Sequence, residues 1–111
     1  IPTTLPTLDE LIGLNGIEAG NVAGKLLEVT AARPSTPPVY TLHTEMEGLQ
    51  LLPVFESLLS GWKSQGYRLA PMRSLFESLT LSGLPLHDVT DGTVPGRSGT
   101  LSVQGTLASH V

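Results

Sequence analysis

One histidine of this chain lies where a proton-transferring residue is expected. His43 follows residues 39–42, Val-Tyr-Thr-Leu, a run that favours a β-strand and begins after two prolines. In α/β folds, reacting groups gather at the carboxyl ends of parallel strands. Among side chains, histidine also has the unperturbed pKa closest to physiological pH, which suits proton transfer. The pattern favours His43 as a general acid or base, and the alternative is an ordinary loop residue.

Other motif searches exclude several kinds of site. His43, His87 and His110 show neither His-x-x-x-His nor His-Glu-x-x-His spacing, so we expect no metal triad within this chain. His87 and Asp88 are adjacent, yet no Gly-x-Ser-x-Gly elbow accompanies them, and we interpret them as surface residues. The glycines of residues 20–24 are not followed by the Lys-Ser or Lys-Thr pair of a phosphate-binding loop.

The amino-acid composition excludes several classes of binding partner. The 111 residues are 40% hydrophobic and 14% charged, with a net charge of −4 and no cysteine. The negative charge argues against nucleic acid, and six scattered basic residues form no polybasic membrane patch. Without cysteine there are no disulfides or thiolate metal sites, which is compatible with a reducing cytoplasm. The sequence contains no apolar run of roughly 18 residues, so we expect no transmembrane segment.

Hydrophobic spacing and helix-end signals predict three helices before residue 66. Thr7 begins a short helical turn, with Glu10 completing a capping box. A helix over residues 21–32 starts at Asn21 and ends before Pro34. A longer helix has Pro53 in its first turn and ends at Gly66. The expected buried positions of these last two helices are Val22, Leu26, Val29, Leu52, Phe55, Leu59 and Trp62, with Leu51 and Leu58 beside the stripe of the longer helix.

Residues 67–111 give weaker signals. Residues 67–70 are a short strand candidate, and Pro71 opens a further helix. The apolar stripe of this helix is expected to be core: Met72, Leu75, Phe76 and Leu79. Beyond residue 83 the chain is expected to be extended or partly loose, with turns at residues 91–92 and 95–96. Alternating strands and helices imply an α/β fold of parallel strands with helices outside, although two or three strands cannot close a barrel.

Three segments carry a family resemblance. Residues 1–10 resemble Ile-Pro-x-Thr-Leu-Pro-Thr-x-Asp-Glu, and residues 37–48 resemble Pro-Val-Tyr-Thr-Ile-His-x-Glu-x-Glu-Gly with one extra proline and Leu42 for Ile. Residues 95–99 resemble a Gly-Arg-Glu-Gly turn, with Ser98 replacing the acid. In order and spacing, these segments resemble a formamide-cleaving branch of the polysaccharide-deacetylase family.

The resemblance implies a fold for the whole protein and a position of this chain within that fold. The chain is expected to be the C-terminal portion of a distorted (β/α) barrel, incomplete by itself. Residues 1–83 would be the closing β/α units, and residues 84–111 a C-terminal extension or wrapping tail. Because the family's metal-binding motifs precede the counterpart of Ile1, we expect a truncated piece that is inactive alone. Its opening does not read as a signal peptide.

The resemblance also implies the chemistry. A divalent metal, held by an Asp and two His residues upstream of this chain, would activate water and polarise the carbonyl. His43 matches the separate histidine that protonates the leaving nitrogen. Many relatives carry Leu two residues before this histidine, where it lines the acyl pocket, whereas this chain has Thr41. A narrower or more polar wall suits a formyl group, but Leu42 could equally occupy that place, so formyl and acetyl both remain open.

Further polar residues flank this motif. Glu45 and Glu47 are two apart, so in an extended segment their carboxylates share one face. Either could orient the His43 imidazolium, or bind sugar hydroxyls or an amine product; the alternative is a solvated loop with two surface acids. Thr7 and Asp9 are expected to line the sugar site as an extension of the resemblance.

The substrate implied is a lipid-linked aminosugar, met at the cytoplasmic face of the bacterial inner membrane. The membrane surface would be reached through this substrate rather than through a spanning segment. Two other interpretations remain open: a related sugar N-deacetylase, and a non-catalytic α/β remnant or interaction module. Leu79, Leu81, Leu84 and Leu86 could meet a lipid tail, but we favour the barrel wall as their location.

Overall fold

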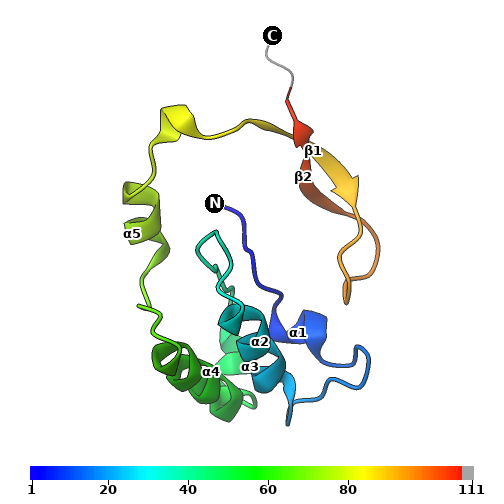
Figure 1. The fold of residues 1–111 in the computed structure, drawn as a ribbon. Coiled ribbons are helices and arrows are strands. Elements are labelled where there is room, and N and C mark those ends of the chain that lie inside the picture. Colours follow the sequence, from blue (N-terminus) through cyan, green and yellow to red (C-terminus); the bar gives the residue numbers. More distant parts are fainter. Residues whose placement is uncertain (109–111) are drawn as a thin grey trace. The chain divides into compact units, whose positions relative to one another are not determined.

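A computed structural model describes residues 1–108 of the chain as a mixed α/β structure with two compact units (Figure 1). The first unit, Ile1–Ala70, contains α1 (Leu8–Leu11), α2 (Val22–Ala31), α3 (Thr44–Glu47) and α4 (Leu52–Ser64). The second, Pro71–Val111, contains α5 (Met72–Glu77), the 3-10 helix η1 (Leu81–Gly83), β1 (His87–Gly92) and β2 (Leu101–Leu107). The division into residues 1–83 and a tail concerns the implied barrel and stays a prediction.

The end signals of α4 are confirmed. Pro53 lies in the first turn, where its missing N–H costs no helical hydrogen bond. Gly66 follows the C-cap with φ +85°, a left-handed conformation that glycine adopts without steric penalty. Leu58 and Trp62 are the buried residues of α4. Of the predicted stripe, Trp62 is buried and Phe55 and Leu59 are half-buried, but Leu52 is 43% exposed, so the prediction is wrong at Leu52.

The buried face of α2 differs from the prediction at one position. Val22 and Leu26 are fully buried as expected, but Val29 is 51% exposed and Thr30 is buried instead. The inner stripe therefore continues at i+4 rather than i+3. Thr30 tolerates burial because its hydroxyl donates a 2.7 Å hydrogen bond to Oε1 of Gln65, beyond the end of α4.

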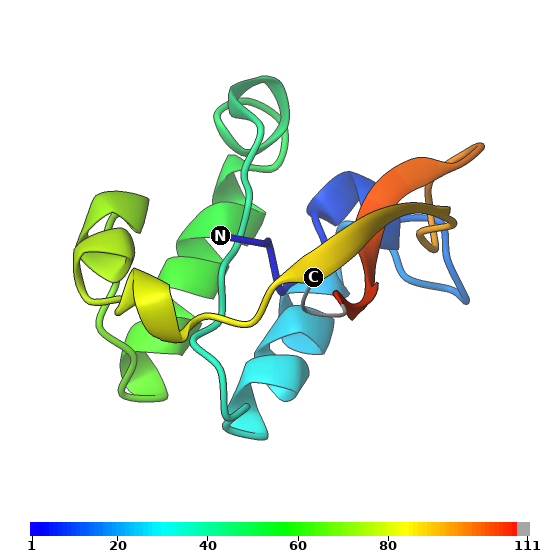
Figure 2. The ribbon, with the colours of Figure 1, turned by 90° about the horizontal axis from the view of Figure 1, so that it is seen from above.

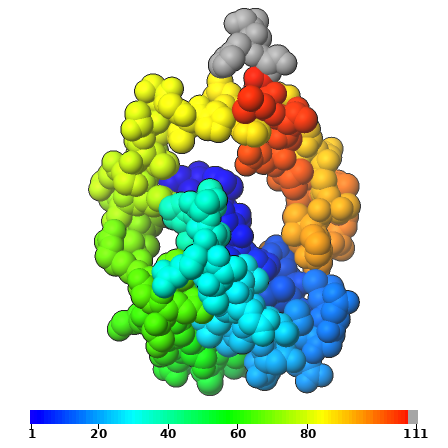
Figure 3. Space-filling model, in the orientation of Figure 1, coloured from blue at the N-terminus to red at the C-terminus, as the bar shows by residue number. Residues whose placement is uncertain are grey.

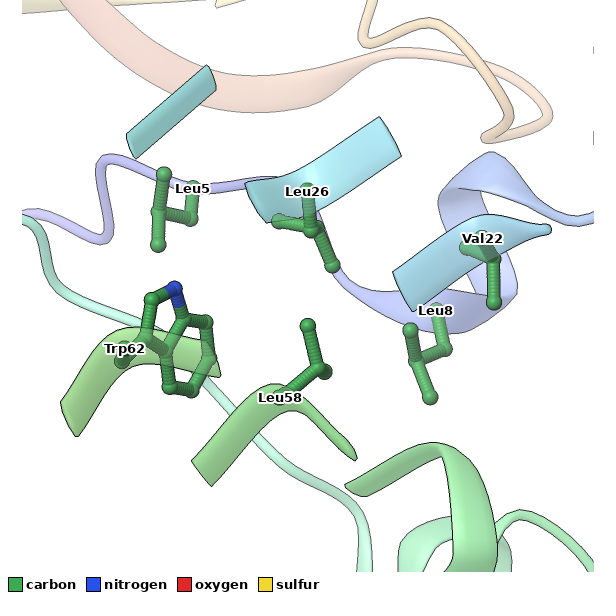
Figure 4. Close-up of a cluster of buried hydrophobic side chains, with 6 residues drawn as sticks. All are labelled: Leu5, Leu8, Val22, Leu26, Leu58 and Trp62. Carbon is green, nitrogen blue, oxygen red and sulfur yellow. The ribbon is translucent and has the colours of Figure 1, made fainter. Parts of the chain in front are cut away.

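The core of the first unit lies between α2 and α4, which pack together, and the chain's first turn (Figure 4). From α4, Leu58 points toward Leu26 of α2, and Trp62 points toward Leu5. Leu5 and Leu8 complete the cluster from the N-terminal segment and α1. The residues leading into the first turn, 5–8, are thereby fixed to the two main helices.

A polar cluster joins the C-terminal ends of α2 and α4; it consists of Thr30, Arg33, Gln65 and Tyr67. Nε2 of Gln65 donates to the Leu27 carbonyl at 2.8 Å, and the Tyr67 hydroxyl donates to the Thr30 carbonyl at 2.7 Å. The Arg33 guanidinium donates to the Gln65 carbonyl and lies 5.2 Å from the centre of the Tyr67 ring. Residues 67–70 do not form the strand that the sequence favoured, because Tyr67 is held against a helix end rather than in a ladder.

The strand expected at residues 39–42 is also absent. This segment lacks a strand ladder and lies against the N-terminal segment, which is dark blue in Figure 3. The Val39 carbonyl accepts from the N–H groups of Thr4 and Leu5, at 3.1 and 3.0 Å, and Val39 N–H donates to Oγ1 of Thr4 at 2.7 Å. Neighbouring backbone groups lack the continuous partner that a ladder requires.

The second unit corrects two expectations. None of the residues of α5 is buried, and Phe76 is 52% exposed, so the predicted core role of its stripe is wrong for this structure. Strands β1 and β2 form an antiparallel hairpin, seen side by side in Figure 2. Within residues 1–108 this two-stranded hairpin is the one sheet present, so the expected parallel sheet is absent from them. The extended conformation expected beyond residue 83 is confirmed for both strands, and the loop between them contains the turn at residues 95–96.

No helix of residues 1–108 combines the length and the apolar character needed to span a bilayer.

Candidate functional site

His43 lies at the junction of an extended segment and a short helix. It is the N-cap of α3, with an extended backbone of φ −116° and ψ 119°. Its carbonyl accepts from the N–H groups of Met46 and Glu47, at 2.9 and 3.0 Å. The expected place of His43 at a strand end is therefore wrong, and a helix start holds the residue instead.

The His43 ring faces a carboxylate of α1, from a distant part of the sequence. Nδ1 of His43 lies 3.7 Å from Oδ1 of Asp9, and each side chain is 32% exposed. Nδ1 itself is buried and makes no hydrogen bond within residues 1–108. The Asp9 carboxylate is thus the group facing this nitrogen, at a distance suited to a charge interaction.

The start of α1 explains the orientation of Asp9. The Thr7 hydroxyl donates a 2.6 Å hydrogen bond to Oδ1 of Asp9, the same oxygen that faces His43. The predicted capping box is confirmed, with Thr7 N–H donating to Oε2 of Glu10 at 3.0 Å. Leu8, between Thr7 and Asp9, is fully buried. Thr7 and Asp9, predicted to line one site, are brought together beside His43.

Glu45 and Glu47 do not share a face, because α3 replaces the expected extended segment. Glu45 is exposed, as the alternative of surface acids implied, whereas Glu47 is only 1% exposed. Oε1 of Glu47 accepts from the Tyr40 hydroxyl at 2.6 Å, and Oε2 accepts from His43 N–H at 2.8 Å. Glu47 thus binds the backbone of His43, not its ring. The sequence analysis did not identify Tyr40 as a partner of Glu47. The available indication was a tyrosine hydroxyl seven residues before a carboxylate.

Thr41 and Leu42, the two candidates for the acyl-pocket wall, differ in exposure. Thr41 is half-buried, while Leu42 is exposed. Both lie on the extended segment that leads to His43. Their contact with an acyl group stays a prediction.

Tyr40 is half-buried, and its ring is 5.3 Å from that of Trp62 at an angle of 59°. Burial raises the pKa of the Tyr40 phenol well above its usual range, and the Glu47 hydrogen bond and the charges of Glu47 and Asp9 add to the rise. Above pH 10 the unfolded chain loses this proton while the folded chain keeps it, so stability falls as pH rises.

We therefore expect Tyr40 to remain protonated until alkaline unfolding. Absorbance at 295 nm, followed with far-UV circular dichroism, should show its ionisation coinciding with loss of helix. The Tyr40→Phe variant should lack that component of the transition. Ionisation of Tyr40 in the folded chain near pH 10 would contradict the protection that this hydrogen bond and partial burial provide.

Residues 1–108 contain no group of three or more His, Cys, Asp or Glu side chains that could hold a metal ion. The metal implied by the family resemblance, with ligands expected upstream of this chain, stays a prediction.

Comparison with known proteins confirms the resemblance along nearly the whole chain. The sequence is 33% identical, over 96% of its length, to a probable 4-deoxy-4-formamido-L-arabinose-phosphoundecaprenol deformylase of Shewanella sediminis. A protein of the same description from Wigglesworthia glossinidia brevipalpis is 31% identical over 94% of the chain. The chain spans about a third of the length of these relatives, 34% and 35%. No family model matches it.

Proposed function

We propose that this chain is the proton-donating, C-terminal part of a metal-dependent amide hydrolase that deformylates undecaprenyl-phosphate-linked 4-formamido-arabinose. The likeness to two deformylases over more than nine-tenths of the chain supports the reaction class. The observation that carries the assignment to particular residues is the 3.7 Å separation of the His43 ring and the Asp9 carboxylate.

The proposed reaction needs a proton at one defined moment. Attack of water on the formyl carbon gives a tetrahedral intermediate, which collapses when the carbon–nitrogen bond breaks. Nitrogen leaving without a proton would be an amide anion, a very poor leaving group. In this proposal His43 is the catalytic general acid and donates that proton.

Asp9 has a separate role in the same step. A histidine ring nitrogen that faces a carboxylate favours the tautomer and orientation in which that nitrogen carries a proton. With Nδ1 facing Asp9, Nε2 is the nitrogen available to the substrate. Thr7 supports the arrangement by binding the same Asp9 oxygen. Glu45, Thr41 and Leu42 remain the proposed contacts to the sugar and the acyl group.

The complete protein would supply what this chain lacks. The proposal places a divalent metal there, with ligands that precede residue 1, and a distorted (β/α) barrel to which residues 1–83 contribute closing units. The product would be the cationic aminoarabinose used to modify lipid A. Lower negative charge at the outer surface weakens binding of cationic peptides such as polymyxin. The lipid-linked substrate places the reaction at the cytoplasmic face of the inner membrane.

Formate release from the formamido sugar by the complete protein, compared with acetate release from its acetamido analogue, tests this function. Preference for formyl supports the deformylase, and preference for acetyl supports the related N-deacetylase that Thr41 and Leu42 leave open. Absence of both products from folded, metal-loaded protein would support the non-catalytic alternative. We expect residues 1–111 alone to release neither product.

A further inference from the structure

Glu47 is a buried carboxylate whose two oxygens serve different parts of the chain. One oxygen accepts from the Tyr40 hydroxyl at 2.6 Å and the other from His43 N–H at 2.8 Å. A carboxylate removed from water to this degree is unfavourable unless hydrogen bonds replace its hydration. Each oxygen has such a donor, so the position of Glu47 is coupled to both partners.

The link between Glu47 and His43 is reciprocal. The Glu47 side chain accepts from His43 N–H, and the His43 carbonyl accepts from Glu47 N–H at 3.0 Å. These two bonds close a ring around the single turn of α3, which is too short to be stable by itself. The turn ends at Gly48, where a Cβ would press against the Thr44 carbonyl oxygen. Glu47 therefore fixes the backbone from which the His43 side chain projects.

The other oxygen connects this turn to the core. Tyr40 packs its ring against Trp62, a buried residue of α4 in the hydrophobic cluster. The chain Trp62–Tyr40–Glu47–His43 is thus a continuous set of contacts from the core to the ring that faces Asp9. Side chains that must meet a substrate accurately are best held by a packed support of this kind.

We propose that Glu47 is the positioning residue of His43: its buried carboxylate, anchored by Tyr40, sets the backbone of His43 so that the ring meets Asp9 and the leaving nitrogen. The catalytic part of this proposal rests on the proposed function. The structural part, coupling of Glu47 to the place of the His43 ring, does not.

The structural part is tested by NMR on the chain of residues 1–111. In the parent, the carboxylate bond should shift the His43 amide proton downfield and slow its exchange. Glu47→Ala should remove both effects and weaken the nuclear Overhauser contacts between the His43 ring and Asp9. Glu47→Gln keeps one acceptor oxygen and should retain most of them. Tyr40→Phe removes only the anchor and should have a smaller effect, which also serves if Glu47→Ala fails to fold.

The catalytic part is tested in the complete, metal-loaded protein. Displacing a reacting group by about 1 Å costs up to about 100-fold. We expect Glu47→Ala to lower kcat about 10- to 100-fold per folded molecule, with KM nearly unchanged, and Glu47→Gln to recover most of it. The matched control is Glu56→Ala, which removes an exposed glutamate of α4 and should leave kcat unchanged.

The two arms separate the possible failures. An unchanged His43 amide and ring in both Glu47 variants would overturn the positioning role, whatever the activity. If the ring moves but kcat per folded molecule stays at the parent value, the catalytic part is overturned. If the parent protein hydrolyses neither substrate, the proposed function fails, and the NMR arm alone still decides whether Glu47 positions His43.

Discussion

Replacing His43 with alanine should lower the turnover of the complete protein about 10²–10⁴-fold, the usual contribution of general acid catalysis. The variant keeps Asp9 and the buried Glu47, but no group remains beside Asp9 to protonate the departing nitrogen. Metal content should stay at the parent level, because the proposed ligands lie elsewhere. Formate release under saturating substrate, with metal content measured on the same samples, checks both statements.

A matched histidine variant separates loss of chemistry from loss of structure. His87 lies in β1, where its ring nitrogen Nδ1 is 3.0 Å from the Gly105 carbonyl oxygen, and it is not among the proposed site residues. His87→Ala should keep the parent turnover. Unchanged turnover of a well-folded His43→Ala protein would instead remove His43 from the mechanism.

Replacing Leu58 with alanine should lower the free energy of unfolding by about 2–5 kcal/mol, as for other buried leucines. Leu58 is fully buried and faces Leu26 and Leu8 in the centre of the cluster (Figure 4). Since small domains are stable by about 5–15 kcal/mol, this change removes a large share of the total. Urea unfolding of the parent and variant, followed by circular dichroism and Trp62 fluorescence, measures the difference.

Val29→Ala is the control that also distinguishes the structure from the sequence pattern. The helical spacing predicted Val29 to be buried, whereas it is half-exposed on α2. Substitutions at exposed positions usually change stability by no more than about 0.5 kcal/mol. A loss near that of a core valine would mean that α2 packs through the face that the sequence favoured.

Local signals predicted α1, α2 and α4 of the first unit because the start and end of each depend on residues close in sequence. The Thr7–Glu10 capping box, the Pro53 start and the Gly66 end are all contained within one or two helical turns. The choice between Val29 and Thr30 was different, since it depends on Gln65, 35 residues after Thr30. No period read from α2 alone reveals that acceptor.

The candidate site shows the same division. His43 and Asp9 could each be picked out from motif context, but their proximity depends on how the segments around Thr4 and Val39 meet. The extended run before His43 favoured a strand, yet a strand forms only where a neighbour offers a ladder of backbone groups. The burial of Glu47 was missed for a related reason: α3, rather than an extended segment, directs it toward the Tyr40 hydroxyl.

The polar cluster has a consequence for how this region tolerates changes of length. Arg33 is hydrogen-bonded to the end of α4, and Val39 is hydrogen-bonded to Thr4. The exposed residues 34–37 therefore form a loop between two anchored residues. Doubling the length of such a connection raises its closure cost by only about 0.6 kcal/mol. We therefore expect this loop to accommodate insertions without displacing the His43 ring. The extra proline of residues 37–38 lies at the end of this loop, just before the hydrogen-bonded Val39.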